Sequence, residues 1–376
     1  MVILQSDKAI ETHANVEKLI ELMKFPELDV EYTFTADLKM VNLSIGLSSC
    51  NCIFSCPYCQ GAKWAFNKKG KWKETNKFGQ YFPGKPRTLG NIKLNKRRFV
   101  VLGKGKNAPK YKNCIRNVVS LWSEDMDHVK TLSLFPIDPL HVILLGPIND
   151  LMPLLRKKFP TQIDDFLARH NLKNNEGIGG TFAGLLSLVS FLLFEFYFII
   201  GPSIRRLLTE ELLIDLQSSL QSQSVNDNAV ALPVVQYMRA LRELYHVCVA
   251  KHLDPNFSSY IDEYRLRFTH LFQMLRLPWT LKQHIILEHL GEFFTEFNVT
   301  LRATSGEYIE SVHSSLRRLE EIHGLHTETK IGTKSHVKRL IKSSCLFNFK
   351  NEGFRMINLG VPHNVTDEFW SEDLLY

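Results

Sequence analysis

Apolar side chains recur every three or four residues through most of residues 121–277, which is the period of an amphipathic helix. The clearest runs lie at 237–248 and 260–275. The same period predicts later helices at 281–297, 306–322 and 335–344, while the polar residues 218–228 predict a linker. The chain is therefore expected to be mostly helical.

The N-terminal part has a different pattern. Residues 12–23 have helical spacing, and residues 30–37 are rich in β-branched and aromatic side chains, which predicts a strand that ends at Asp37. Glycine and proline interrupt residues 50–117 so often that we expect an irregular inserted module with one strand at 99–102. The predicted fold class is α+β and predominantly helical.

Residues 181–200 are anomalous, because this stretch of twenty residues carries a single charge, Glu195. Its length and composition meet the criterion for a membrane-spanning helix, so a single-pass membrane protein is one alternative. The beginning of the chain lacks the features of a signal peptide, and seven cysteines are too few for a disulfide scaffold. A reducing compartment, the cytosol or nucleus, is the default expectation.

Charge is concentrated in residues 63–116, which hold 17 Lys and Arg but only one acid, Glu74. This segment has a net charge of +16, so the rest of the chain sums to −9. Aromatic residues interleave with the cations, and lysines neutralise phosphates while aromatic rings stack on bases. The pattern favours a nucleic-acid-binding module over a solvated loop, with these candidate contacts: Lys63, Lys68, Lys69, Lys71, Lys73, Lys96, Arg97, Arg98, Lys104 and Lys106.

Cys56 and Cys59 form a CxxC turn, whose two thiolates can share one tetrahedral metal ion. A structural zinc needs four ligands, and no second CxxC is present. The missing ligands would come from Cys50 or Cys52, Cys114, or a distant histidine such as His141; the alternative is a set of idle buried thiols. His284 and His289 are five residues apart, so we interpret them as packing or surface residues.

Asp37, Asp138 and Glu310 stand out among the acids by position. Carboxylates from distant segments can hold two Mg²⁺ ions for phosphodiester chemistry, although helix capping is the commoner role of a single acid. Several short sequence motifs follow one another along the chain: Ala36 to Lys39 with Asn42 and Gly46, Cys56 to Cys59, Asp138 to His141 with Leu145 to Pro147 and Asn149, and Ser305 to His313.

In this order the motifs resemble the catalytic half of DDE-type transposases of eukaryotic cut-and-paste DNA transposons, over about residues 11–348. The resemblance implies an RNase H-like core, a helical insertion before the catalytic Glu, and Mg²⁺-dependent DNA cleavage and strand transfer. Asp37 is then the second catalytic Asp, Glu310 the late Glu, and Asp138 with His141 an Asp-x2-His element in which His141 is a structural or metal-site residue. A rival mapping makes Asp37 the first Asp and Asp138 the second.

Under the first mapping, the strands that carry the first Asp are missing, so we expect an N-terminally truncated, inactive relic that binds DNA in the nucleus. The resemblance divides the chain into a partial core (1–49), the basic insertion (50–117), the helical insertion (118–280), helices that carry Glu310 (281–348) and a tail (349–376). Relatives continue directly across the position of residues 185–201, so a translated intron is the alternative to a membrane span. Expected partners are DNA, either transposon ends or nonspecific sites, and a second copy of the chain.

Overall fold

The computed structural model describes eight stretches of the chain, all within one compact unit of residues 6–306. Several predicted features lie outside these stretches: the helix at 12–23, most of the strand at 30–37, the segment 181–200, and the helices at 306–322 and 335–344. The described residues are 37–48, 52–66, 70–75, 79–102, 109–114, 127–172, 201–221 and 225–304.

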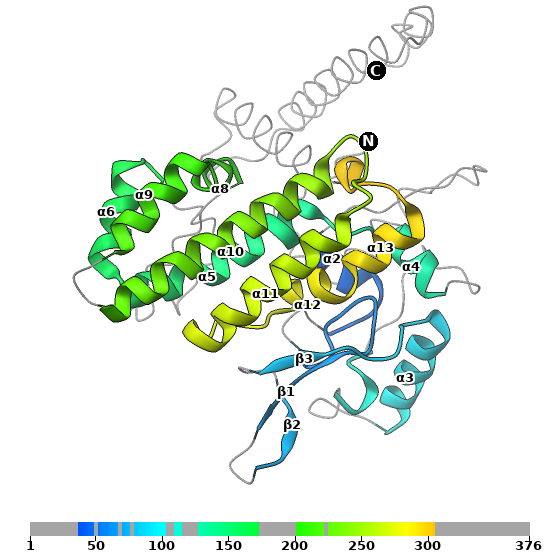
Figure 1. Ribbon diagram of the computed structural model, residues 1–376. Coiled ribbons are helices and arrows are strands. Elements are labelled where there is room, and N and C mark those ends of the chain that lie inside the picture. Colours follow the sequence, from blue (N-terminus) through cyan, green and yellow to red (C-terminus); the bar gives the residue numbers. More distant parts are fainter. Residues whose placement is uncertain are drawn as a thin grey trace, which may run out of the picture. The chain divides into compact units, whose positions relative to one another are not determined.

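The described part is predominantly helical with one small sheet, which confirms the predicted class at this coarse level (Figure 1). Its helices are α2 (Leu38–Ser44), α3 (Leu89–Leu102), α4 (His128–Leu134), π-helix η2 (Leu140–Leu145), α5 (Gly146–Lys158), α6 (Pro160–Arg169), α8 (Gly201–Leu207), α9 (Glu210–Leu220), α10 (Val225–Val249), α11 (Phe257–Leu275), α12 (Leu281–Glu288), α13 (Leu290–Phe297) and the short 3-10 helix η3 (Arg302–Thr304). None of the helices in the stretches described here is both long and apolar enough to cross a bilayer.

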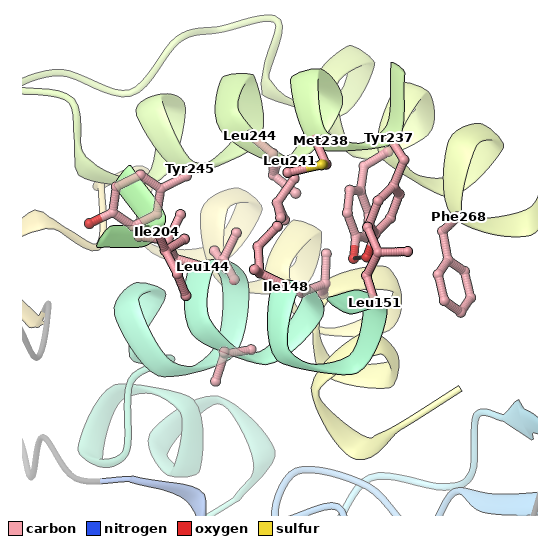
Figure 2. Close-up of a cluster of buried hydrophobic side chains, with 14 of the residues drawn as sticks. Leu144, Ile148, Leu151, Ile204, Tyr237, Met238, Leu241, Leu244, Tyr245 and Phe268 are labelled. Carbon is pink, nitrogen blue, oxygen red and sulfur yellow. Dashed lines mark hydrogen bonds between the residues drawn. The ribbon is translucent and has the colours of Figure 1, made fainter. Parts of the chain in front are cut away.

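The main core lies between α10 and the helices packed against it. Figure 2 shows Leu241 and Leu244 of α10 pointing toward Ile148 and Leu151, which belong to α5. All four side chains are fully buried, as expected when helices bury an apolar stripe of period 3.6. Burial of such side chains is worth about 1.5–3 kcal/mol each, so this layer is the principal source of stability in the described unit.

Three short antiparallel strands form a sheet in the order β2-β1-β3, with β1 (Ala62–Phe66) in the middle, β2 (Trp72–Glu74) and β3 (Gln80–Phe82). Phe66 lies opposite Trp72, and Lys63 lies opposite Tyr81. The sheet belongs to residues 50–117, which we call the basic module. An RNase H-like core is not visible in the described residues, where the sheet has these three strands alone.

Three local predictions were wrong. Residues 99–102 are helical, because α3 begins just after Thr88, whose hydroxyl accepts from the Asn91 N–H, and continues to Leu102. The linker predicted at 218–228 is shorter, since α9 extends to Leu220 and α10 begins at Val225. The single helix predicted at 281–297 is two helices that meet at His289.

A buried arginine organises the loops of the basic module. Arg87 is fully buried, and its guanidinium donates to the carbonyl oxygens of Cys56 (2.8 Å), Phe54 (3.1 Å) and Lys112 (3.3 Å) and to the Cys114 sulfur. Because backbone carbonyls that are buried without a donor are costly, this side chain ties two loops together.

We therefore predict that Arg87→Leu destabilises the full chain by at least about 3 kcal/mol, since three buried carbonyls lose their donor at about 1–3 kcal/mol each. Arg97→Leu is the matched control: it removes the same charge from an exposed position on α3 and should change stability by less than about 0.5 kcal/mol. Urea unfolding of both variants is the measurement. Equal midpoints would contradict the role assigned to Arg87.

Candidate metal centre and basic module

The CxxC turn lies in a loop that several hydrogen bonds hold in place. Arg87 binds the Cys56 carbonyl, the Tyr58 hydroxyl donates to the Phe135 carbonyl at 2.9 Å, and the Gly61 N–H donates to the Cys59 sulfur at 3.2 Å. Both cysteines are fully buried or nearly so. The loop therefore presents two sulfurs to the interior and not to solvent.

Two histidines reach the same point from the other half of the chain. On one continuous helix, residues five apart lie about 140° apart around the axis. Here α12 ends at Glu288, His289 has φ −112° and ψ −17°, and α13 begins at Leu290. This break changes the direction of the chain, so that His284 and His289 both face the cysteines.

The four side chains form one compact donor set, which we call the Cys2His2 cluster. The Cys56 sulfur lies 3.3 Å from His289 Nε2 and the Cys59 sulfur 3.2 Å from His284 Nε2, and all four donor atoms lie within 4.8 Å of one another. In a tetrahedral zinc site, ordinary bond lengths place neighbouring S and N ligands about 3.6 Å apart. The cluster therefore fits a zinc ion, with all four positions filled by protein.

Each histidine is oriented by a different neighbour. His289 Nδ1 lies 2.6 Å from the Glu292 carboxylate, which is the usual support for a metal-binding imidazole. The His284 ring stacks on Tyr81 of β3, with centroids 4.7 Å apart and planes 21° apart, and its Nδ1 has no hydrogen-bond partner among the described residues. Packing fixes one ring, and a carboxylate fixes the other.

Gly61 also shapes the site. A Cβ atom at this position would lie 3.0 Å from the Cys59 sulfur and 3.2 Å from Cε1 of His284, as well as 2.9 Å from the Phe82 carbonyl oxygen. These distances are too short for a side chain. Glycine therefore lets the backbone approach the cluster and donate its N–H to sulfur.

Burial and the hydrogen bonds within the cluster shift the pKa values of three of its members. The Cys56 thiol, followed by His284 and His289, stabilises the Cys59 thiolate and holds the pKa of Cys59 far below its usual range. Burial raises the pKa of Cys56. Burial also opposes the charged form of His289, but hydrogen bonds with Cys59 and Glu292 outweigh it and raise the pKa of His289 to about 9. A zinc ion would be held by the deprotonated sulfurs of Cys56 and Cys59 and by the neutral imidazoles of His284 and His289, so its binding would release the protons of Cys56 and His289.

Two of the four members of the cluster were predicted from sequence as metal ligands, and two were not. His284 and His289, which we interpreted as packing or surface residues, are buried and lie together with the two cysteines, because the helix breaks between them. The signal was present: His-x4-His falls within the His-x3–5-His spacing that commonly accompanies CxxC in zinc sites. His141 lies elsewhere, with Nδ1 2.6 Å from Asp138, and Cys114 contacts Arg87. Cys52 is half-buried and, like Cys114, is not a member of the cluster, while Cys50 is not described.

Asp37 and Asp138, two of the three candidate catalytic acids, lie at the starts of helices. Asp37 is exposed and caps α2 by accepting from the Met40 N–H at 2.8 Å. Asp138 is buried, accepts from the Leu140 N–H at 3.0 Å and pairs with His141. Glu310 lies outside the described residues. Among those that are described, the Cys2His2 cluster is the one group of three or more Cys, His, Asp or Glu side chains with metal-binding geometry, so a Mg²⁺ site is not supported.

The residues predicted to contact nucleic acid differ in how exposed they are. Lys71, Lys73, Arg97 and Arg98 are exposed, and Lys96 is half-buried. Lys63 is different: its ammonium lies 5.6 Å from the centroid of the Tyr81 ring, and burial lowers its pKa. Lys63 therefore faces the interior. The remaining candidates are not described: Lys68, Lys69, Lys104 and Lys106.

No known protein-family model matches this chain, and no curated protein matches it significantly.

We predict that Glu292→Gln weakens zinc binding about 10- to 100-fold, because the His289 imidazole loses the carboxylate that orients it. Glu296→Gln, one turn further along α13 and exposed, is the matched control and should leave the affinity unchanged. Competition with a chromogenic chelator measures both affinities. Indistinguishable affinities would contradict the supporting role of Glu292.

Proposed function

We propose that this chain is a nucleic-acid-binding protein in which one structural zinc ion holds the basic module on the helical domain. The proposal includes a nuclear location, DNA as the physiological partner and descent from the DDE-type transposases that the sequence resembles. One observation carries it: two ligands of the Cys2His2 cluster belong to the segment that bears the +16 charge, and the other two belong to the helices.

A closed four-ligand site is typical of structural zinc, since catalytic zinc keeps one position open for water or substrate. Cys56 and Cys59 would hold the ion from the basic module, and His284 and His289 from α12 and its junction with α13. The ion would supply a rigid cross-link. Rigidity matters for phosphate binding, because cations on a fixed surface lose less conformational entropy when they engage the nucleic acid.

The exposed cations support the choice of ligand. Arg97 and Arg98 lie next to each other on α3, and Lys71 and Lys73 flank Trp72 in β2. Within residues 63–116, Glu74 is the one acid that could neutralise them. A surface with this imbalance of charge attracts polyanions and gives salt-dependent binding.

The transposase ancestry predicts what the chain does not do. Because Asp37 caps α2 and Asp138 pairs with His141, we predict no Mg²⁺- or Mn²⁺-dependent nicking or strand transfer by the purified chain. The measurement is supercoiled-plasmid relaxation with each metal. Nicking that disappears in Asp37→Asn or Glu310→Gln would contradict the prediction and favour the mapping with Asp37, Asp138 and Glu310 as the triad.

The binding proposal predicts a linear fall of log K with log salt, with a slope of about −0.9 for each phosphate that the protein neutralises on duplex DNA. Arg97→Glu/Arg98→Glu should make this slope less steep, by about 0.9 for each phosphate that is no longer neutralised. Lys251→Glu/Arg302→Glu reverses two exposed cations outside the basic module and should leave it unchanged. Fluorescence anisotropy between about 50 and 200 mM salt, a range in which such slopes are large, is the measurement. A slope near zero for the wild-type chain would overturn the proposal.

A further inference from the structure

The small sheet of the basic module has two different faces. Successive side chains of a strand point to opposite faces, and Lys63 lies opposite Tyr81 in the register. That face turns inward, because Tyr81 is 5% exposed and stacks on His284 of the Cys2His2 cluster. The other face bears Phe66, Trp72 and Phe82, which we call the aromatic strip.

The aromatic strip is exposed and continuous. Phe66 is 61% exposed, Trp72 47% and Phe82 39%. The ring centroids of Phe66 and Trp72 are 4.3 Å apart, and those of Trp72 and Phe82 are 5.4 Å apart. Trp72 therefore joins the other two rings into one apolar surface.

A surface of this kind indicates a ligand, because contiguous exposed apolar patches mark binding sites. Its surroundings indicate which ligand. Lys71, next to Trp72 in the chain, and Lys85, three residues after Phe82, are exposed, whereas the side chain of Lys73 alternates to the face of Lys63 and Tyr81. The matching ligand must offer flat apolar groups and a negatively charged backbone together.

Unpaired nucleotides have both properties, whereas a duplex hides the faces of its bases in the stack. Aromatic side chains on an antiparallel sheet are a common platform for such bases, since every base has a π-face. We therefore propose that Phe66, Trp72 and Phe82 stack on unpaired bases of a single-stranded nucleic acid, while neighbouring lysines contact its phosphates. This inference rests on the proposed nucleic-acid binding and deepens it, by naming unpaired strands as the preferred form.

The test compares three ligands of equal length and label with the full, zinc-loaded chain: single-stranded oligo-dT, a duplex, and an abasic oligonucleotide that keeps the phosphates but lacks bases. We expect oligo-dT to bind most tightly. Trp72→Ala should weaken oligo-dT binding about 5- to 150-fold, the range for removal of one base–aromatic stack, and leave the abasic ligand unaffected. Trp72→Phe should retain most of the affinity, because it keeps a ring.

Val101→Ala is the matched control, because Val101 is 78% exposed on α3 and lies outside the strip. It should not change binding of any ligand. Near-UV circular dichroism and zinc content show that each variant remains folded.

Four outcomes would overturn the inference. Trp72→Ala could weaken the binding of all three ligands equally, or of none of them, while binding remains salt-dependent. Either result would leave the proposed polyanion binding intact and contradict base stacking. Salt-independent or absent binding of every ligand would reject both proposals. A concentration-dependent dimer in sedimentation velocity that Trp72→Ala abolishes would instead make the strip an interface between copies of the chain.

Discussion

The convergence of two sulfurs and two imidazoles is the constraint that joins the basic module to the helices. Partners in this cluster are 225 and 233 residues apart in sequence, yet their donor atoms lie 3.2 and 3.3 Å apart. Buried thiolate and imidazolium groups are costly without compensation, so the surrounding polar contacts are obligatory. Arg87 holds the loop that carries the cysteines, Glu292 holds His289, and Gly61 leaves space for both halves to meet.

The same cluster explains why the sheet has an inside and an outside. Once Tyr81 packs on His284, the alternation of side chains along a strand forces Phe82 to the opposite face. The register of the sheet then aligns it with Trp72 and Phe66. The packing of Tyr81 against the Cys2His2 cluster and the exposure of the aromatic strip are thus two results of one strand register.

Local signals in the sequence predicted the local features well. The helical period identified most of the α-helical region, and the CxxC spacing identified two members of the Cys2His2 cluster, because both depend on residues a few positions apart. The errors came from longer-range context. Phe99 to Leu102 has strand-like composition but continues a helix whose buried Leu89 and Ile92 are anchored in a second core cluster. His284 and His289 were missed because the break between α12 and α13 depends on tertiary packing.

Each cysteine of the cluster is far in sequence from the histidine that it contacts, and this distance affects how the chain tolerates changes in length. The entropic cost of closing a flexible loop grows only with the logarithm of its length, by about 0.6 kcal/mol for each doubling. Between ligands more than two hundred residues apart, an added segment as long as residues 185–201 would raise this cost by less than about 0.1 kcal/mol. An insertion in a flexible loop between Cys59 and His284 would therefore add almost no closure cost at the Cys2His2 cluster. A one-residue insertion between His284 and His289 would instead rotate one imidazole by about 100° relative to the other.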